Sequence, residues 1–421
     1  QMKLYVKELA SQIPATVLKV CQTYKDNGFQ CWLVGGCLRD YFLVHNFQDI
    51  DLATDALPAE TQDLFAHTTD IGSAYGTILV KEDGMALEVT TLRQEDDYAD
   101  GRHPEQVVFA KDLKADLARR DFTVNSLAYD PLSRELFDHY NGLNDLQNKL
   151  LKTVGDPRKR FREDGLRLMR ACRFIAQLGF ELEDQTFLAL QETKNALKKI
   201  SQERTASEFN KLIEAPFAED GLRAMLETGL LEIKFPELAS FSEEQWQRSW
   251  PLLKLAEPGW RSLVLAKLIS DEQGIKTAER FLQNLKYNKA QIASYLLIIA
   301  NLRILYDKQA TDSALRAFIQ KIGKGNTLLW LKLYQVFDSL YNNHSASELK
   351  KMEKRFQELC LDPLTIEELA LKGDDLLKMG IPKGPRIGQI MRKLLEIVIE
   401  YPQKNSWSQL IGYAKELSNM P

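Results

Sequence analysis

Two adjacent glycines, Gly35-Gly36, separate a short apolar run from a helical pattern near the start of this chain. The apolar run, 31–34, predicts a buried strand, and the segment that begins at Cys37 predicts a helix. Backbone N–H groups at the start of a helix have no partner within that helix, and the helix dipole favours a negative charge there. The strand, turn and helix together predict a site that can hold a phosphate group.

Two aspartates, Asp49 and Asp51, follow this turn on either side of a single apolar residue. They lie at the start of a strand-like stretch, 50–53, and residues i and i+2 of a strand project to the same face. Mg²⁺ prefers carboxylate and phosphate oxygens, so the pair indicates a metal-dependent reaction on a nucleoside triphosphate. An Asp-x-Asp pair is also found at ordinary solvated strand ends. Glu88, an acidic residue among β-forming neighbours, is either a third carboxylate of this metal site or a surface strand residue.

The composition is that of an ordinary globular protein, with 44% hydrophobic and 27% charged residues. A chain of 421 residues exceeds one compact core, so about two to four domains are expected. No run of about 18 apolar residues is present, so no membrane partner is expected, and the N-terminal residues do not resemble a signal peptide. The five cysteines are scattered, which favours reduced thiols and a cytoplasmic location. A net charge of −4 argues against indiscriminate coating of nucleic acid but allows a local basic face.

The apolar pattern changes character near residue 150. Before that point the strand-like stretches are 31–34, 50–53, 77–80, 87–92 and 107–109, and helical patterns lie around 17–25, 38–44, 61–65 and 124–129. This mixture predicts an α+β unit, a small mixed sheet with helices. After Asn148 the helical period of apolar residues dominates, so the rest of the chain is expected to be an elongated all-α region.

A second polar motif, Arg119-Arg120-Asp121, continues to Asn125. In isolation, two arginines before an aspartate form an ordinary surface salt bridge. Beside a triphosphate site, Arg120 is a candidate phosphate ligand, because its planar guanidinium matches phosphate oxygens. Asp121 and Asn125 would share one helix face and hold a ribose or orient that arginine.

A third motif lies in the run 160–174, which predicts a helix that mixes apolar and cationic residues. Asp164 and Arg167 stand three residues apart and would be neighbours on that helix. The pair is either a salt bridge on a solvated helix or a reader of a nucleobase. Arg170 and Arg173 continue the same spacing, but each step of three residues turns the helix face by roughly 60°. Arg173 therefore suits a phosphate or structural role better than a base contact.

If Asp164 and Arg167 contact a nucleobase, their chemistry makes a specific prediction. Cytosine and adenine each present an amino donor beside a ring-nitrogen acceptor, which match the carboxylate and the guanidinium. Uracil and guanine present the opposite pattern and would leave both side chains unpaired, at a cost of about 1–3 kcal/mol for each buried polar group. The pair therefore predicts selection of C and A.

These motifs occur in a fixed order between residues 31 and 212. They are Leu33-Val34-Gly35-Gly36-x-x-Arg39-Asp40, Asp49-x-Asp51-x-Ala53-Thr54, Arg119-Arg120-Asp121-Phe122-Thr123-x-Asn125, Glu163-Asp164-x-x-Arg167-x-x-Arg170-Ala171-x-Arg173-Phe174 and Ser201-x-Glu203-Arg204-x-x-x-Glu208-Phe209-x-Lys211-Leu212. The set resembles the ordered motifs of the class II tRNA nucleotidyltransferases, the bacterial and eukaryotic CCA-adding enzymes of the DNA polymerase beta nucleotidyltransferase superfamily. The region after about residue 215 matches only loosely.

The resemblance implies four parts: a catalytic nucleotidyltransferase head at 1–150, a helical neck for base recognition at 151–215, a helical body at 216–310 and a helical, tRNA-binding tail at 311–421. It also implies that Asp49, Asp51 and Glu88 are catalytic and hold Mg²⁺. The nucleotide-binding residues that it implies are Gly35, Gly36, Arg39, Arg120, Asn125, Asp164, Arg167, Arg170 and Arg173.

The activity implied by the resemblance is template-independent addition of CCA to tRNA 3′ ends from CTP and ATP, by two-Mg²⁺ transfer with release of pyrophosphate. Related enzymes add only CC, only A, or poly(A). The polar segment from Arg93 to His103 matches a head loop that CC-only members lack, and no long basic C-terminal extension of the poly(A) polymerase kind is seen. An A-only or poly(A)-type enzyme and a non-catalytic RNA-binding relative stay as alternatives, the last disfavoured by the three acidic residues.

The partner implied is the acceptor end of tRNA, bound through its shape and backbone. Candidate contacts are the basic segments 286–289, 321–325 and 380–388. The last is a Gly- and Pro-rich turn before a helix, which is either a phosphate site or an ordinary interhelical turn. A monomer and a homodimer are both compatible with the sequence.

Overall fold

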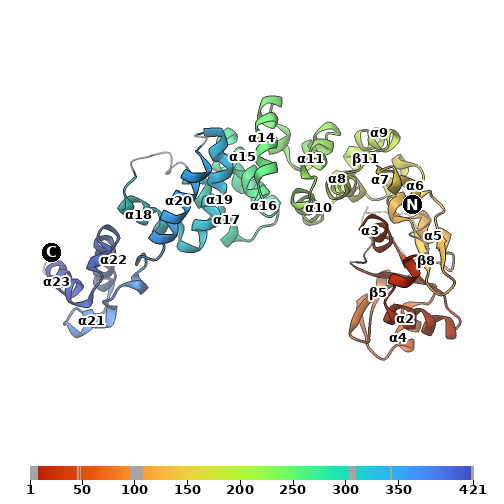
Figure 1. Ribbon diagram of the computed structural model, residues 1–421, viewed down its shortest axis with the longest axis horizontal. Coiled ribbons are helices and arrows are strands. Elements are labelled where there is room, and N and C mark those ends of the chain that lie inside the picture. Colours follow the sequence, from red (N-terminus) through yellow and green to blue (C-terminus); the bar gives the residue numbers. More distant parts are fainter. Residues whose placement is uncertain are drawn as a thin grey trace. The chain divides into compact units, whose positions relative to one another are not determined.

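The computed structural model describes residues 8–44, 47, 49–94, 108–302, 310–341 and 344–418 (Figure 1). The chain divides into two compact units, Gln1–Phe241 and Ser242–Pro421. The first unit contains a mixed sheet followed by helices, and the described part of the second unit contains helices and no strand. The predicted α+β fold class, with a sheet-containing head and a long helical remainder, is confirmed. The finer division into head, neck, body and tail stays a prediction.

The sheet of the first unit has seven strands in the order β3-β4-β5-β2-β1-β8-β9. Their bounds are β1 Cys31–Val34, β2 Asp51–Thr54, β3 Thr68–Gly72, β4 Thr77–Glu82, β5 Met85–Thr91, β8 Ala128–Asp130 and β9 Glu135–Phe137. The β2–β5 pair is parallel, whereas the other neighbours are antiparallel. All four residues of β1 are buried, as expected for a strand with neighbours on both sides. The parallel pairing of β2 with β5 places Asp51, the first residue of β2, beside a residue that lies much later in the chain.

The helix expected at 124–129 is wrong. The chain there forms a single 3₁₀ turn, η2 (Thr123–Asn125), and then enters β8, which pairs with β1. The reason is that a short apolar run contains too few residues for its periodicity to distinguish a helix from a buried strand. Strands β3 and β9 also lie outside the stretches that the sequence indicated.

Helices make up most of the remainder of the first unit. They are α2 Ala15–Asp26, α3 Gly36–Val44, α4 Pro58–Leu64, α5 Leu113–Ala118, α6 Gly142–Gln147, α7 Pro157–Glu163, α8 Leu166–Leu178, α9 Asp184–Thr193, α10 Gln202–Glu214, α11 Ala218–Glu227, α12 Leu230–Lys234 and α13 Pro236–Ala239, with 3₁₀ turns η1 Ser73–Tyr75 and η3 Lys194–Lys199. Two short parallel strands, β10 Leu150–Leu151 and β11 Glu181–Leu182, interrupt the region expected to be all helical. Helix α8 packs against α10 and α11, so it is the central element of this part.

The polar segment predicted at 93–103 is described only at its base. Strands β6 (Arg93–Gln94) and β7 (Val108–Phe109) pair in antiparallel fashion. Residues 95–107, which include most of the predicted loop, lie outside the described residues.

In the described part of the second unit, the regular elements are helices and 3₁₀ turns. They are α14 Glu243–Leu255, α15 Arg261–Gln273, α16 Ile275–Asn284, α17 Lys289–Ala300, α18 Asp312–Ile322, α19 Lys324–Tyr341, α20 Ala346–Leu359, η5 Ile366–Glu368, α21 Gly373–Lys378, α22 Pro385–Glu400, η6 Pro402–Lys404 and α23 Trp407–Ser418. No described helix in either unit combines the length and apolar character needed to cross a membrane.

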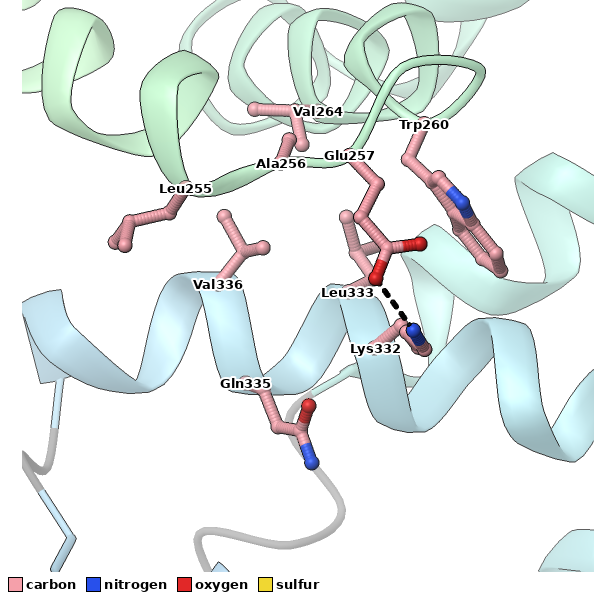
Figure 2. A pocket seen from close by; sticks show the side chains of 9 residues that line it. All are labelled: Leu255, Ala256, Glu257, Trp260, Val264, Lys332, Leu333, Gln335 and Val336. Carbon is pink, nitrogen blue, oxygen red and sulfur yellow. Dashed lines mark hydrogen bonds and ion pairs between the residues drawn. The ribbon is translucent and has the colours of Figure 1, made fainter. Parts of the chain in front are cut away.

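A small cleft lies in the second unit between the α14–α15 connection and α19 (Figure 2). An ion pair crosses it, with Lys332 Nζ 2.7 Å from Glu257 Oε1. Its volume of about 180 Å³ is below the range of roughly 300–1,000 Å³ typical of small-molecule sites. This cleft is therefore too small to hold a nucleotide.

Candidate functional site

A cavity of about 810 Å³ in the first unit is lined mainly by charged and polar side chains. All twelve site residues selected from the sequence line it: Gly35, Gly36, Arg39, Asp49, Asp51, Glu88, Arg120, Asn125, Asp164, Arg167, Arg170 and Arg173. They come from the sheet strands and adjoining loops, from α3, from the η2 turn and the loop before it, from the junction between α7 and α8, and from α8. The fold thus brings residues from distant parts of the sequence to one concave surface large enough for a nucleotide.

Three carboxylates form the acidic end of this cavity. Asp51 begins β2, and its register partner on the parallel strand β5 is Glu88, while Asp49 lies just before β2. Burial raises the pKa of Asp51, and the negative charges of Glu88 and Asp49 raise it further, against the opposing effect of Arg120. The carboxylates therefore repel one another, and a cation would relieve that repulsion.

The donor set at this acidic end suits a metal that is completed by substrate. Among the described residues, no three His, Cys, Asp or Glu side chains already converge on one point closely enough to hold a metal ion. Mg²⁺ is commonly held by one or two carboxylates together with waters and substrate phosphates, rather than by a closed protein cage. The all-oxygen set of Asp49, Asp51 and Glu88 fits that mode of binding.

The glycine turn holds an arginine against the backbone. Gly35 has a φ of +74°, and a Cβ atom there would lie 2.6 Å from Nη1 of Arg120. Glycine at position 35 adopts this positive φ without strain, and its lack of a Cβ atom leaves room for the Arg120 guanidinium. The N–H of Gly35 itself donates to the carbonyl of Leu127 at 3.1 Å, so this N–H is not available to a phosphate.

Arg120 forms an ion pair with Asp116, a residue that the sequence analysis did not select. Asp116 is 1% exposed, and its two carboxylate oxygens accept from Arg119 at 2.6 Å and from Arg120 at 3.1 Å. Burial by itself would raise the pKa of Asp116, but the two guanidiniums outweigh it and the pKa is lowered. The i, i+3 and i+4 spacing of these residues is the signal from which this clamp could have been found.

Asp121 has a different partner from the one expected. It accepts hydrogen bonds from Arg170 of α8 at 2.6 and 2.8 Å, not from Arg120, and from the Asn125 amide at 3.0 Å. The Asn125 side-chain oxygen in turn accepts from Arg39 at 2.8 Å. Asp121 and Asn125 do contact each other, but across a 3₁₀ turn rather than along a helix face. These hydrogen bonds link α8 to α3.

Replacing Asp121 with asparagine should lower the free energy of unfolding by about 2 kcal/mol at pH 7. Burial opposes ionisation of Asp121, but Arg170 and the hydrogen bonds of Asn125 and Phe122 hold its pKa at about 2, below the ordinary value of 3.8. This stabilisation is therefore complete above about pH 4 and is lost as the pH falls through the folded-state pKa. Urea denaturation should show a difference between wild type and variant that is about half as large at pH 3 as at pH 7. A difference that does not shrink on acidification would contradict the assignment.

The expected continuous helix over 160–174 is wrong, because α7 ends at Glu163 and α8 begins at Leu166. Asp164 has an extended conformation, with φ −138° and ψ 106°, and its side chain accepts from the N–H of Leu166 at 2.9 Å. Asp164 and Arg167 are therefore not neighbours on one helix face. Asp164 pairs with Arg204 at 3.3 Å, whereas Arg167 pairs with Glu163 at 2.8 Å.

Arg167 is further restrained by two backbone carbonyls. Its guanidinium donates to the carbonyls of Arg160 at 3.0 Å and Arg119 at 3.1 Å. The side chain is buried but lines the cavity together with Asp164. Both residues are thus held by other groups before any nucleotide binds, which is the rigidity that a selective site requires.

Gly165 at the break between α7 and α8 should not tolerate alanine. A Cβ atom there would lie 2.5 Å from the carbonyl oxygen of Ala196 in η3, which is backbone and cannot rotate away. We expect Gly165→Ala to cost about 1–3 kcal/mol of stability, measured by urea denaturation, and to reduce nucleotide selection through the displaced Asp164. Gly388→Ala in α22 is the control, because nothing lies within 4 Å of its added Cβ. Equal stability of the two variants would refute the close approach.

Other cavity residues were not selected from the sequence. The cavity is also lined by Thr77, Thr90, Arg93, Arg119, Phe174, Arg204 and Lys211. Four of them, Arg119, Phe174, Arg204 and Lys211, belong to the motifs quoted in the sequence analysis, so motif membership was a signal for them. Arg173, for which a phosphate or structural role was preferred, lines the cavity and pairs with Glu208 of α10.

Three family models match this chain. The poly A polymerase head domain matches residues 31–152, the "Probable RNA and SrmB- binding site of polymerase A" matches 179–242, and domain 2 of tRNA nucleotidyltransferase matches 260–414. The first of these covers the sheet and most of the cavity residues. Together the three models cover most of the chain.

Curated relatives match nearly the full length. A CCA-adding enzyme from Geobacillus sp. strain WCH70 is 35% identical over 388 residues, which are 91% of this chain and 92% of that protein. A CCA-adding enzyme from Streptococcus mutans is 32% identical over 421 residues, 98% of this chain and 99% of that protein. Among solved structures, the Bacillus stearothermophilus CCA-adding enzyme in complex with CTP is similar, with a TM-score of 0.79, 29% identity and coverage of 96% of this chain and 97% of that chain.

Proposed function

Since this chain belongs to the family of bacterial CCA-adding enzymes, we propose that it adds C, C and A to the 3′ end of tRNA from CTP and ATP. The observation that carries the proposal is the single cavity that joins the carboxylates of β2 and β5, the arginines of the η2 region and the Asp164–Arg167 pair. A nucleotide in that cavity could meet all three groups at once. Addition is directed by these side chains, without a nucleic-acid template.

Asp49, Asp51 and Glu88 would hold Mg²⁺ together with phosphate oxygens of the nucleotide. When bound, the ion would supply Lewis-acid activation of the attacking hydroxyl and stabilise the charge on the leaving pyrophosphate. Burial, and then the negative charges of Glu88 and Asp49, raise the pKa of Asp51, and this supports the assignment because a bound cation would relieve the repulsion between the carboxylates.

The reaction joins the 3′ oxygen of tRNA to the α-phosphorus of the nucleotide and breaks the bond to pyrophosphate. Arg120, paired with Asp116 and close to the Gly35–Gly36 turn, would bind phosphate oxygens of the nucleotide. Arg39 is held by Asp40 at 2.7 Å and by Asn125 at 2.8 Å, so it too would meet the nucleotide with little loss of freedom. Prior restraint of both guanidiniums lowers the entropy cost of holding the triphosphate in line.

Base selection would use the edges of Asp164 and Arg167. The carboxylate would accept from the amino group of C or A, and the guanidinium would donate to the adjacent ring nitrogen. The ion pair of Asp164 with Arg204 supports this role, because it restrains the position of the carboxylate whose oxygens would accept from the base.

Binding of tRNA would involve the second unit. Its basic segments differ in how far their charged groups are already paired within the protein. Lys324 pairs with Glu368 at 2.5 Å and donates to the Asp362 carbonyl, so its ammonium already has protein partners. The turn 380–388 leads into α22, a helix of 16 residues that begins at Pro385. We propose the turn as a phosphate contact on the strength of this helix start.

The direct test is incubation of the purified protein and Mg²⁺ with tRNA that lacks its last three nucleotides. CTP alone should add two residues, ATP alone should add none, and the two together should add three. Long A tails with ATP alone would indicate a poly(A)-type enzyme, and extension only of tRNA ending in CC would indicate an A-only enzyme. Binding of tRNA without any incorporation would indicate the non-catalytic alternative.

A further inference from the structure

Three arginines surround the ring of one phenylalanine in the cavity wall. The guanidinium carbons of Arg173, Arg39 and Arg170 lie 4.0, 5.1 and 5.3 Å from the centroid of Phe174. The ring is 3% exposed, yet it lines the cavity. All three distances are within the range of about 6 Å over which a cation is attracted to an aromatic face. The ring of Phe174 therefore lies close to the guanidiniums of three arginines that line the cavity.

The three arginines come from two different elements and have separate acidic partners. Arg39 belongs to α3 and pairs with Asp40, whereas Arg170 and Arg173 belong to α8 and pair with Asp121 and Glu208. The ring itself is held edge-on by Phe122, with centroids 5.5 Å apart at an interplanar angle of 80°. The contact of Phe174 with Arg39 therefore connects α3 to α8 at the cavity wall.

The position of Arg173 beside Arg170 has an electrostatic cost for Arg173. Burial lowers the pKa of Arg173, and the positive charge of Arg170 lowers it further, against the opposing effect of Glu208. The face of an aromatic ring carries negative potential, and in a desolvated setting it attracts a guanidinium more strongly than at an exposed site. A phenyl ring at this position offsets repulsion without adding a formal negative charge that would repel a phosphate.

We propose that Phe174 is a positioning residue that holds Arg39, Arg170 and Arg173 together as one cationic wall for the triphosphate of the incoming nucleotide. Phe174 acts through the negative potential of its ring face, and not only through the volume that the ring fills. This inference rests on the proposed function, since it assigns the substrate group that the wall contacts. An aliphatic side chain of similar size would fill the space but would not attract the guanidiniums.

The test replaces Phe174 in the full-length protein with ring-fluorinated phenylalanines, introduced by stop-codon suppression. One, two and three fluorines progressively withdraw negative charge from the ring face while changing its size little. We expect kcat/KM for CTP addition to decrease with each fluorine and to fall by about tenfold with three. Melting temperature should stay close to that of the wild type, because the packing volume is preserved.

The matched control is the same fluorine series at Phe161 of α7. Its side chain is as deeply buried, and within the described residues no cation lies over its ring. This series should leave kcat/KM unchanged. A flat series at Phe174, or equal losses at both positions, would overturn the positioning role. Wild-type protein that adds no nucleotide would instead refute the proposed function, so the two failures are distinguishable.

Discussion

Asp51→Asn should reduce CTP addition by about a thousandfold or more, because it removes a carboxylate that would hold Mg²⁺ and hence several kcal/mol of transition-state stabilisation. Asp51 opens β2 directly opposite Glu88 in the register, so no other side chain of β2 can replace it. The measurement is the single-turnover rate of CTP addition to tRNA that lacks CCA. Asp63→Asn is the control, because Asp63 is exposed on α4 and lies outside the cavity.

The same substitution should leave the fold as stable as before, or more stable, when no divalent ion is present. Burial and the neighbouring Glu88 raise the pKa of Asp51, so the folded state binds this proton more tightly than the unfolded chain does. The stability that depends on this proton is present below the unfolded-state pKa and is lost as the pH rises through the folded-state value. At neutral pH the neutral amide removes that repulsion. Full activity of Asp51→Asn, or a large loss of stability in the metal-free protein, would contradict the metal assignment.

The double variant Asp164→Ala, Arg167→Ala should incorporate UTP and GTP as well as CTP and ATP. Each unpaired buried polar group costs about 1–3 kcal/mol, so loss of both should reduce discrimination by about a hundredfold or more. The measurement is kcat/KM for each of the four nucleotides on the same tRNA. Arg162→Ala is the control, since Arg162 is exposed on α7 and does not line the cavity.

Arg167 also has a structural role, which the experiment must separate. It donates to Glu163 and to two backbone carbonyls, so its removal should lower the melting temperature. Asp164→Asn avoids this loss, because an amide oxygen can still accept from the N–H of Leu166. The amide can also donate to the O4 atom of uracil, so this single variant should already admit UTP. Lower rates with unchanged nucleotide preference in both variants would rule out selection by this pair.

Several elements of the site could be predicted because their signals are local. The Gly35-Gly36 turn, the Asp-x-Asp pair and the spaced arginines are patterns within a few residues, and the resemblance depended on their order. Glu88 could be suspected because an acidic residue is unusual among β-forming neighbours. All of these residues line the one cavity. Their roles in binding and catalysis stay predictions that the experiments above test.

Other features could not be predicted, because they depend on packing between distant segments. The pairs Arg170–Asp121 and Arg204–Asp164 join residues 49 and 40 positions apart. The chain at the Gly165 break packs closely against the Ala196 carbonyl, and strand β8 pairs with β1, which lies far from it in the sequence. Local period and propensity carry no information about such neighbours.

The sequence alone identified the chemical groups of the site, because carboxylates, guanidiniums and glycines at short spacings have a limited set of uses. The pairing of each of these side chains with its partner was decided only by the tertiary structure. Asp116 pairs with Arg120, Asp121 pairs with Arg170, and the ring of Phe174 lies close to the guanidiniums of Arg39, Arg170 and Arg173. The physical reason is that burial makes electrostatic pairing strong, and burial is set by how elements pack rather than by their order along the chain.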